Sequence, residues 1–362
     1  MILSGCRMWA RVLRQSDDDR AMGRASAQCV SAERPEESVD IVLPVAGFGT
    51  RLRPQTWTKP KPLVSVAGKP MLEHVLDRVL PLHPDKVVFI TGFLGDQIES
   101  WARDNLDVPV AFVEQPEMRG QTDAILRTRD LVAGDSLILF PDMLFEADFS
   151  PLRDVAADVV MFTKEVEDPS ALGIAVVENG RIVRLVEKPR EPISNLAVIG
   201  IYYVRHMPDL YTAIEEQMQR GLSLKNEYFI ADAIQLMIDA GAKVIPMPVT
   251  EWEDCGNAET LLGTNRYLLQ RQNRDVPTRS GSVIVSPSFV ADDAVVEHSI
   301  VGPFASIGPG VTVRESIVRD CIVEERATIS GALLDGSIVG RRARISGLAR
   351  GLNVGDDAVV GT

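Results

Sequence analysis

Hydrophobic positions in residues 39–272 follow two alternating spacings, which predict strands and helices in turn. Short aliphatic runs that end at turn residues predict buried strands over residues 41–46, 86–92, 108–113 and 136–142. Apolar residues three and four positions apart predict helices over residues 71–80 and 122–129, and one that begins at residue 96. This alternation indicates an α/β fold, in which helices cover both faces of a sheet and ligands bind at the carboxyl ends of its strands.

The second half of this part is richer in β-branched residues and in turns. Strands are predicted over residues 159–164, 173–177, 182–186, 198–204 and 243–248. Amphipathic spacing predicts helices over residues 210–218, 226–240 and 257–270. The last of these helices closes the pattern, so we expect one domain with a mixed sheet over residues 39–272.

The pattern changes at Val283, where aliphatic or aromatic residues begin to recur at about every sixth position. The predicted core positions, which include shifts of frame, are Val283, Phe289, Val295, Val301, Ile307, Val313, Ile317, Val323, Ile329, Leu333, Val339, Ile345, Leu348, Val354 and Val360. Hexapeptide repeats are typical of a left-handed parallel β-helix. We expect one over residues 281–362, with about four coils of about eighteen residues.

Composition limits the possible partners. The chain has 362 residues and a net charge of −13, which disfavours nucleic acid or an anionic membrane as the main partner. No apolar run approaches the roughly 18 residues of a transmembrane helix. Four scattered cysteines have neither metal nor disulfide spacing, so we expect a soluble protein in a reducing compartment, the cytoplasm.

Residues 1–38 differ from the rest of the chain. They carry Arg7, Arg11, Arg14 and the acidic run Asp17-Asp18-Asp19, without the apolar core of a secretory signal. We expect a disordered extension, or an upstream start before Met22, rather than a targeting peptide, and we leave this segment out of the fold.

The loop after the first strand has the character of a phosphate-binding site. Ala46, Gly47, Gly49 and Thr50 leave the strand with little side-chain bulk, so backbone N–H groups can approach a ligand closely. Four cations follow within a short distance, namely Arg51, Arg53, Lys59 and Lys61. The loop is neither a P-loop nor a dinucleotide fingerprint, and we expect it to bind a polyphosphate.

Two later strand ends carry candidate ligand groups. Gln115 can offer a donor and an acceptor to a pyrimidine edge, and Gly120 would let a base lie against the backbone, although an ordinary loop end would have the same residues. Asp142 follows the fourth strand, where phosphates are expected. A carboxylate in that place suggests Mg²⁺, which prefers one or two carboxylates with phosphate oxygens and water; the alternative is a capping residue.

The string Gly-x-Gly-Thr-Arg-Leu-x-Pro from Gly47 to Pro54, followed by Pro-Lys-Pro-Leu, resembles the signature of the sugar-1-phosphate nucleotidyltransferases, which make NDP-sugars. The spacing from Glu187-Lys188-Pro to Asn195-x-Ala-Val198-x-Gly-x-Tyr is similar to that of the glucose-1-phosphate thymidylyltransferases. The resemblance covers nearly the whole chain after residue 38. It implies a Rossmann-like nucleotidyltransferase domain, followed by the β-helix of the long form.

The resemblance also implies roles for single residues. Ala46, Gly47, Gly49, Thr50, Gln115 and Gly120 would bind the nucleotide, and Gly173, Glu187, Asn195 and Val198 the sugar. Arg51 and Lys61 would stabilise charge on the triphosphate, and Lys188 would hold the sugar phosphate unless it is only a solvated strand end. Asp142 and Asp254 would bind Mg²⁺. Cys255 stands where the family has threonine, and we interpret it as a small substitute rather than a nucleophile.

The predicted reaction is attack of a sugar 1-phosphate on the α-phosphorus of an NTP, dTTP or UTP, with release of pyrophosphate. Alternatives are a uridylyl- or guanylyltransferase of the same fold, or a non-catalytic NDP-sugar-binding regulatory subunit. Acyl transfer on the β-helix would want a base, and the repeat contains only His298. We therefore expect the β-helix to serve assembly of a homo-oligomer.

Overall fold

The computed structural model describes residues 39–170, 172–189, 191, 193–272, 279, 281–347 and 351–361. The predicted extension over residues 1–38 and the predicted core position Leu348 lie outside these residues. None of the described helices combines the length and apolar character needed to cross a membrane.

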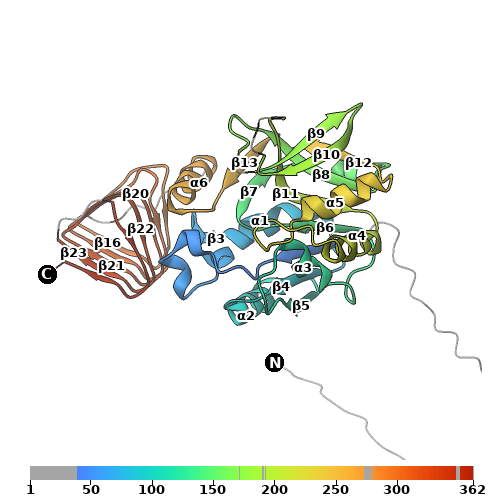
Figure 1. Ribbon diagram of the computed structural model, residues 1–362. Coiled ribbons are helices and arrows are strands. Elements are labelled where there is room, and N and C mark those ends of the chain that lie inside the picture. The colour runs from blue at the N-terminus through green and yellow to red at the C-terminus, as the bar shows by residue number, and fades with distance from the viewer. Residues whose placement is uncertain are drawn as a thin grey trace, which may run out of the picture. The chain divides into compact units, whose positions relative to one another are not determined.

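A mixed nine-stranded sheet forms the centre of the α/β part (Figure 1). Along its main path the strand order is β10-β9-β11-β6-β1-β4-β5, and β8 pairs with β11 and β12. Strands β6, β1, β4 and β5 are parallel, while β11 runs antiparallel to β6. The bounds are β1 (Asp40–Pro44), β4 (Val87–Thr91), β5 (Val110–Glu114), β6 (Ser136–Leu139), β8 (Val159–Glu165), β9 (Gly173–Glu178), β10 (Arg181–Glu187), β11 (Leu196–Val204) and β12 (Val244–Pro248).

Helices cover both faces of this sheet, as the alternation of strands and helices predicts. Their bounds are α1 (Met71–Val79), α2 (Gly95–Asn105), α3 (Gln121–Leu126), α4 (Met207–Gln219), α5 (Ile230–Asp239) and α6 (Ala258–Arg271). Ile41 and Leu43 of β1 pack with α1, α2 and α6 in one core cluster, while Val42 packs with α3, α4 and α5 in another. Because successive side chains of a strand point to opposite faces, one short aliphatic run supplies both cores.

Two features of the α/β part differ from the sequence prediction. The helix expected over residues 226–240 begins only at Ile230, because the backbone of Tyr228 instead bonds with Arg119 and with Thr122 in the first turn of α3. A second, two-stranded sheet of β7 (Met143–Glu146) and β13 (Glu251–Asp254) was not predicted. It brings two distant segments together next to the main sheet, and it matters for the site below.

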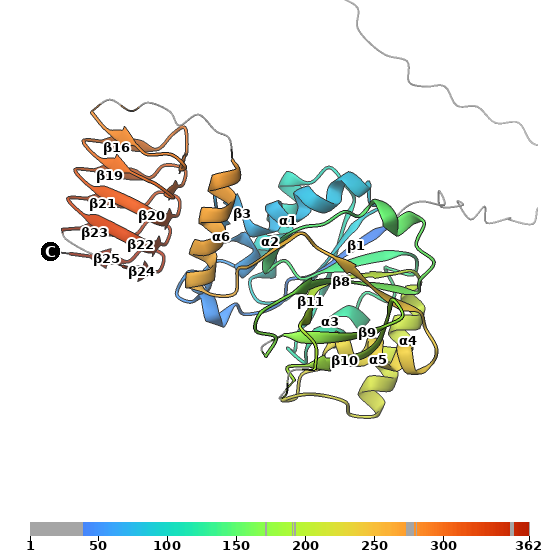
Figure 2. The ribbon, with the colours of Figure 1, turned by 90° about the horizontal axis from the view of Figure 1, so that it is seen from above.

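The C-terminal part is a parallel β-helix, whose coils stack in order in Figure 2. Its strands are β14 (Val283–Ile284), β15 (Phe289–Val290), β16 (Val295–Glu297), β17 (Ile300–Val301), β18 (Ser306–Ile307), β19 (Thr312–Arg314), β20 (Ile317–Val323), β21 (Thr328–Ser330), β22 (Leu333–Val339), β23 (Arg344–Ser346), β24 (Asn353–Val354) and β25 (Val359–Val360). The expected fold class is therefore confirmed.

The predicted frame of the repeat is wrong at several positions. Val283, Val295 and Ile317 are exposed, and their neighbours Ile284, Val296 and Val318 face the interior. The coils are also shorter than the expected length of about eighteen residues. Val296 pairs with Val313, Val313 with Ile329, Ile329 with Ile345 and Ile345 with Val360, so that successive coils take 17, 16, 16 and 15 residues. Five-residue steps at some corners explain the apparent shifts of frame.

The β-helix packs on the α/β part through α6 and a small hairpin of β2 (Ser65–Val66) and β3 (Lys69–Pro70). Ile322 and Ile338 of the β-helix belong to the same apolar cluster as β1 and α1. Asn265 of α6 is fully buried at this boundary, where its side chain bonds with Ala67 N, Ser306 Oγ and Phe304 O. The side chain of Asn265 is therefore hydrogen-bonded at this boundary as a buried amide is in a domain interior.

Candidate active site

Two cavities open beside the carboxyl ends of β1 and β6. The first has a volume of about 440 Å³ and the second of about 750 Å³. Arg51, Gln121, Phe140 and Asp142 line both of them. The two cavities therefore adjoin each other along these four residues.

The first cavity gathers the residues that the sequence predicts for nucleotide binding. Its lining includes Ala46, Gly47, Gly49, Thr50, Arg51, Lys61, Gln115, Gly120 and Asp142. A Cβ on Gly47 would meet no atom within 4 Å, so this stretch of backbone is open to a ligand. Gly49 adopts a φ of 60°, and its carbonyl accepts a hydrogen bond of 2.8 Å from Thr56 Oγ1. The loop is thus held in shape by its own downstream segment.

Only two of the four cations near this loop line the cavity. Arg51 is exposed at the junction and has no ion-pair partner among the described residues. Arg53 instead stacks on Trp57, with its guanidinium carbon 4.4 Å from the ring centre. Lys59 turns away to the β-helix, where Nζ lies 2.6 Å from Glu324 Oε2. The expectation that all four cations lie at the phosphate site is therefore wrong for Arg53 and Lys59, whereas Arg51 and Lys61 line the cavity.

Gln115 is buried at the wall of the first cavity, and its amide orientation is fixed. Its Nε2 donates to Gly120 O at 3.0 Å and to Asp123 Oδ2 at 3.0 Å. Both amide hydrogens are therefore used inside the protein. Contrary to the prediction of a donor and an acceptor, only the acceptor Oε1 is left for a ligand.

Gly120 stands where two chain segments cross. A Cβ there would lie 2.3 Å from Tyr228 N, and its φ is 109°. Tyr228 N donates to Arg119 O at 2.9 Å, and Thr122 N donates to Tyr228 O at 3.2 Å. Glycine is needed at this position because a side chain would clash with the backbone of Tyr228 and because the φ is positive.

Asp142 and Asp254 come together through the small sheet of β7 and β13. Asp254 pairs with Met143 in that sheet, and Cys255 N donates to Asp142 O at 3.0 Å. Both aspartates line the second cavity. Lys61 Nζ lies 3.0 Å from Asp142 Oδ2, so a cation of the glycine-rich loop already contacts this carboxylate.

These two carboxylates fit Mg²⁺. Asp142 Oδ2 is engaged by Lys61, and Asp254 Oδ1 accepts from Gly256 N at 2.9 Å. Among the described residues nothing hydrogen-bonds Oδ1 of Asp142 or Oδ2 of Asp254. Two such carboxylates beside the glycine-rich loop suit Mg²⁺, which prefers one or two carboxylates together with phosphate oxygens and water. No group of three or more His, Cys, Asp and Glu side chains in the described chain forms a metal site.

The second cavity gathers most of the residues predicted to bind the sugar phosphate. Gly173, Glu187, Lys188 and Val198 line it, together with Tyr202, Phe229 and Trp252. Asn195 does not: it is exposed, and its backbone carbonyl accepts a bond of 3.0 Å from Val166 N. Asn195 precedes β11, and the strand carries Val198 rather than Asn195 to the cavity.

Glu187 and Lys188 form a charged pair in this cavity. Lys188 Nζ lies 3.5 Å from Glu187 Oε1 and 5.1 Å from the centre of the Phe229 ring. Burial raises the pKa of Glu187, and the charge of Lys188 opposes that shift. A Cβ on Gly173 would lie 2.8 Å from Glu187 Oε2, so glycine leaves the room that the carboxylate occupies.

The comparisons with known proteins agree with this geometry. Residues 40–271 match the family model described as nucleotidyl transferase, which is more than half of the chain. The chain belongs to the nucleotidyl transferase family. The predicted resemblance and the prediction of an enzyme are confirmed.

Among similar members of the nucleotidyl transferase family is the glucose-1-phosphate thymidylyltransferase of Streptomyces griseus. It is 29% identical over 329 residues, with 83% of this chain and 91% of that protein covered. The UTP–glucose-1-phosphate uridylyltransferase AglF of Haloferax volcanii is 32% identical over 232 residues, with 61% and 93% covered. The crystal structure of UDP-glucose pyrophosphorylase complexed with UDP-glucose shares the fold, with a TM-score of 0.59, 23% identity, and coverage of 65% of this chain and 100% of that one.

Cys255 does not behave as a nucleophile in this nucleotidyltransferase. It is fully buried, and burial raises the pKa of its thiol to about 12. Its Sγ lies 3.5 Å from Thr264 Oγ1, which itself donates to Asp254 O at 3.1 Å. This supports the interpretation of Cys255 as a small packing residue beside a metal-ligand candidate.

Several residues that line the nucleotidyltransferase site were not predicted from the sequence. Gln121 and Phe140 line both cavities, and Glu227 and Gly256 line the first. Gln121 also follows Gly120 directly, so its place at a strand end and helix start was a usable signal. Glu227 reaches the cavity only because the segment before α5 crosses Gly120, a tertiary contact without a sequence signal.

Proposed function

We propose that this nucleotidyltransferase joins the nucleotidyl group of an NTP, dTTP or UTP, to a sugar 1-phosphate and releases pyrophosphate. The observation that carries the proposal is the pair of cavities that meet at Arg51 and Asp142. One has a glycine-rich loop and a fixed acceptor for a base, and the other has a carboxylate and a lysine for a sugar phosphate. The named relatives include enzymes that act on glucose 1-phosphate with either base.

The choice of base rests on Gln115. Its free Oε1 accepts hydrogen bonds, and uracil and thymine present an N3–H donor to such a group, as guanine presents N1–H. Adenine and cytosine have an unprotonated ring nitrogen at the corresponding edge and would face the oxygen with a lone pair. We therefore favour dTTP and UTP, with GTP as the alternative of the same class.

Different charged side chains would bind the two substrates. Arg51 and Lys61 lie on the nucleotide side and would stabilise the triphosphate as negative charge moves to the leaving pyrophosphate. Lys188 would hold the phosphate of the sugar in the second cavity, with its oxygen directed at the α-phosphorus. Glu187, next to it, would accept hydrogen bonds from sugar hydroxyls.

Asp142 and Asp254, which both line the second cavity, would hold Mg²⁺. The ion, when bound, supplies charge neutralisation and a fixed orientation for the phosphate oxygens. The aspartates themselves keep their place through backbone contacts, since Cys255 N bonds with Asp142 O and Gly256 N with the Asp254 carboxylate. We further propose a cytoplasmic homo-oligomer, with residues 39–272 and 281–362 as its two domains.

A panel assay tests this function. The purified full chain is incubated with Mg²⁺, one of five NTPs and one of several sugar 1-phosphates, and kcat/KM is measured from pyrophosphate release. We expect dTTP or UTP to give the highest value, and ATP and CTP values lower by tenfold or more, at about 1.4 kcal/mol per factor of ten. Preference for ATP or CTP would contradict the role given to Gln115.

A further inference from the structure

One carboxylate of the β-helix, Glu324, lies buried at the boundary with the α/β part. Its side chain is 5% exposed and follows the end of β20. Oε2 lies 2.6 Å from Lys59 Nζ, and Oε1 accepts a hydrogen bond of 2.9 Å from Ser65 N. The Lys59 side chain is itself only 13% exposed. Because a buried charge without its partner is costly, loss of either side chain leaves the other as an unpaired charge in a buried position.

Glu324 contacts Lys59 and Ser65, which lie on either side of Lys61 in the sequence. Pro60 and Pro62 flank Lys61 and fix the backbone φ at both positions. A 3₁₀ turn over Lys61–Leu63 is closed by a bond of 3.1 Å from Val64 N to Lys61 O. The segment between the two anchors is therefore short and stiff, so a movement of either anchor displaces Lys61.

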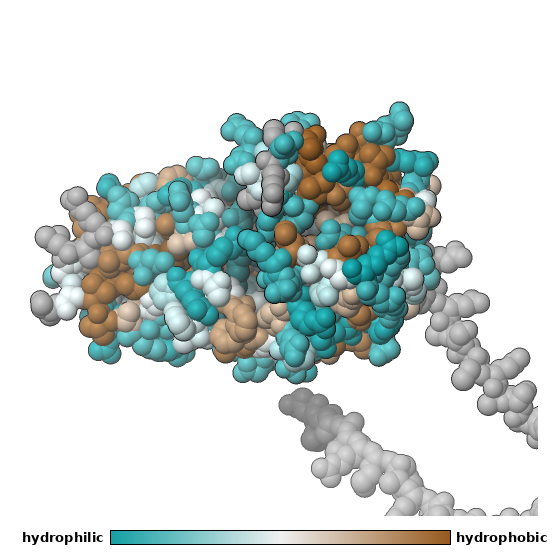
Figure 3. Space-filling view, viewed as in Figure 1, coloured by the Kyte–Doolittle hydropathy of each residue, from teal (hydrophilic) through white to brown (hydrophobic). Residues whose placement is uncertain are grey.

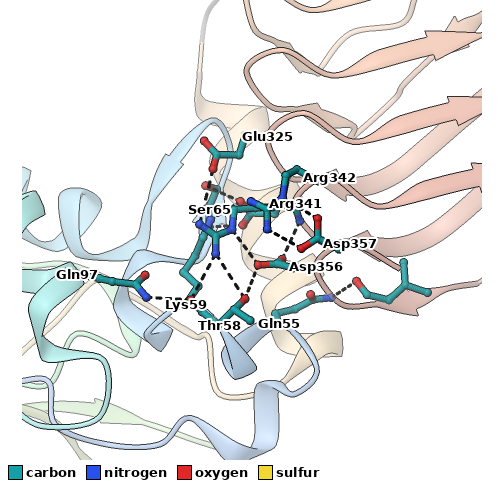
Figure 4. Close-up of polar contacts among 12 residues, drawn as sticks. Gln55, Thr58, Lys59, Ser65, Gln97, Glu325, Arg341, Arg342, Asp356 and Asp357 are labelled. Atoms are coloured by element: carbon teal, nitrogen blue, oxygen red, sulfur yellow. Dashed lines mark hydrogen bonds and ion pairs between the residues drawn. The ribbon is translucent and has the colours of Figure 1, made fainter. Parts of the chain in front are cut away.

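Lys59, Lys61 and Ser65 belong to one segment, residues 55–65, which we call the substrate loop. Its first residues are also attached to the β-helix. Gln55 Nε2 donates to Asn353 Oδ1 at 2.7 Å and to Val354 O at 3.1 Å. Thr58 Oγ1 donates to Asp356, and Arg341 Nε bonds with the same carboxylate at 2.8 Å. Figure 4 shows these loop side chains directed toward those of the last coils. The loop thus rests on the β-helix, while its residues Lys61 and Pro62 line the nucleotide cavity.

We propose that Glu324 is a positioning residue for nucleotidyl transfer: it holds Lys59 and Ser65 and thereby fixes Lys61 at the nucleotide cavity. The β-helix then supports the substrate loop directly, in addition to any role in assembly. The meaning of Lys61 for catalysis rests on the proposed function, whereas the anchoring of the loop does not.

Matched variants of the full chain test the proposal. Glu324→Gln removes the charge and keeps an acceptor for Ser65 N, and Lys59→Met removes the other partner. Asp320→Asn is the control, because the Arg266–Asp320 ion pair also joins α6 to the β-helix, with Nε 2.6 Å from Oδ1, but touches no residue of the loop. The double variant Lys59→Met with Glu324→Gln shows whether the two side chains act through each other.

We expect each single loop variant to lower kcat/KM for the NTP by about tenfold or more, since a misplaced catalytic group is costly. The double variant should be no worse than the poorer single variant, and Asp320→Asn should stay within about twofold of the parent. Values of kcat/KM unchanged in both loop variants, or an equal loss in Asp320→Asn, would overturn the proposal.

Hydrogen–deuterium exchange of residues 55–65 gives a second readout that needs no activity. We expect faster exchange there in Glu324→Gln and Lys59→Met, and parental exchange in Asp320→Asn. If the parent releases no pyrophosphate, the proposed function fails, and the exchange alone decides whether Glu324 fixes the loop. Unchanged exchange in both loop variants would overturn the anchoring itself.

Discussion

At the scale of single residues, the site depends on a few charged groups whose surroundings fix their state. Asp142 is held by Lys61 and Asp254 by Gly256, and the other oxygen of each carboxylate accepts no hydrogen bond from the described residues. Cys255, which directly follows Asp254 in the chain, is kept a neutral thiol by burial, which raises its pKa. The charged groups where the two cavities adjoin are therefore the carboxylates of Asp142 and Asp254 and the cations Arg51 and Lys61.

We expect Asp142→Asn and Asp254→Asn each to reduce kcat by about a hundredfold or more at ordinary Mg²⁺, because each removes a charge that orients and neutralises phosphate. Neither aspartate is buried, so the melting temperature should stay close to that of the parent. Steady-state kinetics with a parallel thermal melt checks this. Turnover within about threefold of the parent in either variant would remove that residue from the metal site.

A buried histidine outside the site predicts a pH effect on stability. His74 Nε2 lies 2.9 Å from Val66 O, and burial lowers the pKa of His74 to about 4, with the charges of Lys69 and Arg78 acting in the same direction. The unfolded chain then binds the extra proton below about pH 6.5, so stability is full above that pH and falls as the pH decreases toward 4.

Between pH 7 and pH 5 we expect His74 to account for a loss of about 2 kcal/mol in the free energy of unfolding. The variant His74→Gln keeps a donor for Val66 O but does not titrate. Urea unfolding of both proteins at the two pH values measures the difference. An equally steep loss in His74→Gln would assign the effect to other groups.

The residues that line the first cavity were predictable from the sequence where a motif fixes both type and spacing. Ala46 to Arg51, Lys61, Gln115 and Asp142 lie together at one cavity, as expected. Lys59 was misjudged because a lysine near a phosphate loop looks the same whether it faces the ligand or a buried glutamate. The prediction that Asn195 lines the sugar site was wrong because no local sequence feature indicates which part of β11 reaches the second cavity.

At the scale of elements, most strands and helices follow from hydrophobic spacing, and the errors have tertiary causes. The sheet of β7 and β13 joins segments about a hundred residues apart, and its short strands have no strong period of their own. The repeat frame was shifted because exposed aliphatic residues such as Val295 and Ile317 stand beside the inward ones and match the hexapeptide spacing equally well.

The hairpin of β2 and β3 gives a prediction at this scale. Gly68 has a φ of 96°, and a Cβ there would lie 2.6 Å from Phe289 Cε2 of the β-helix. Gly68→Ala should destabilise the protein by about 2–3 kcal/mol, through both backbone strain and overpacking. Gly180→Ala is the control: its φ is 75° and its Cβ would meet nothing within 4 Å, so only about 1 kcal/mol of strain is expected. Equal losses in urea unfolding would show that Phe289 does not constrain the hairpin.

At the scale of the whole molecule, the β-helix packs directly against the α/β part. Ile322 and Ile338 pack in the main core, and Glu324 supports the substrate loop. Deleting residues 281–362 would therefore disturb the site and would not isolate a role in assembly. Substitutions on the outer surface of the β-helix are the cleaner approach.

A stripe of aliphatic side chains on successive coils is the surface that we propose for a second copy of the chain. Val283 pairs with Ile300, Ile300 with Ile317 and Ile317 with Leu333, and the first three are 57%, 41% and 38% exposed. In Figure 3 apolar side chains also lie among polar ones on the visible face of the β-helix. A straight stripe can pack against the same stripe of a two-fold related copy.

We expect Ile300→Lys with Ile317→Lys to lower the molar mass measured by light scattering to that of one chain, with the melting temperature of the β-helix little changed. Arg314→Ala, which removes only an exposed ion pair with Glu297, is the control and should leave the mass unchanged. A parent that is already monomeric, or an unaltered mass in the double variant, would contradict the assignment of this surface.

The central claim is that two substrates meet at Arg51 and Asp142 and react directly. The most direct test is pyrophosphate release from dTTP or UTP by the full chain with Mg²⁺, measured with and without a sugar 1-phosphate. Direct transfer predicts release only when both substrates are present, in amounts that match the NDP-sugar formed. Release of pyrophosphate without the sugar phosphate, or binding of both substrates with no release at all, would contradict it.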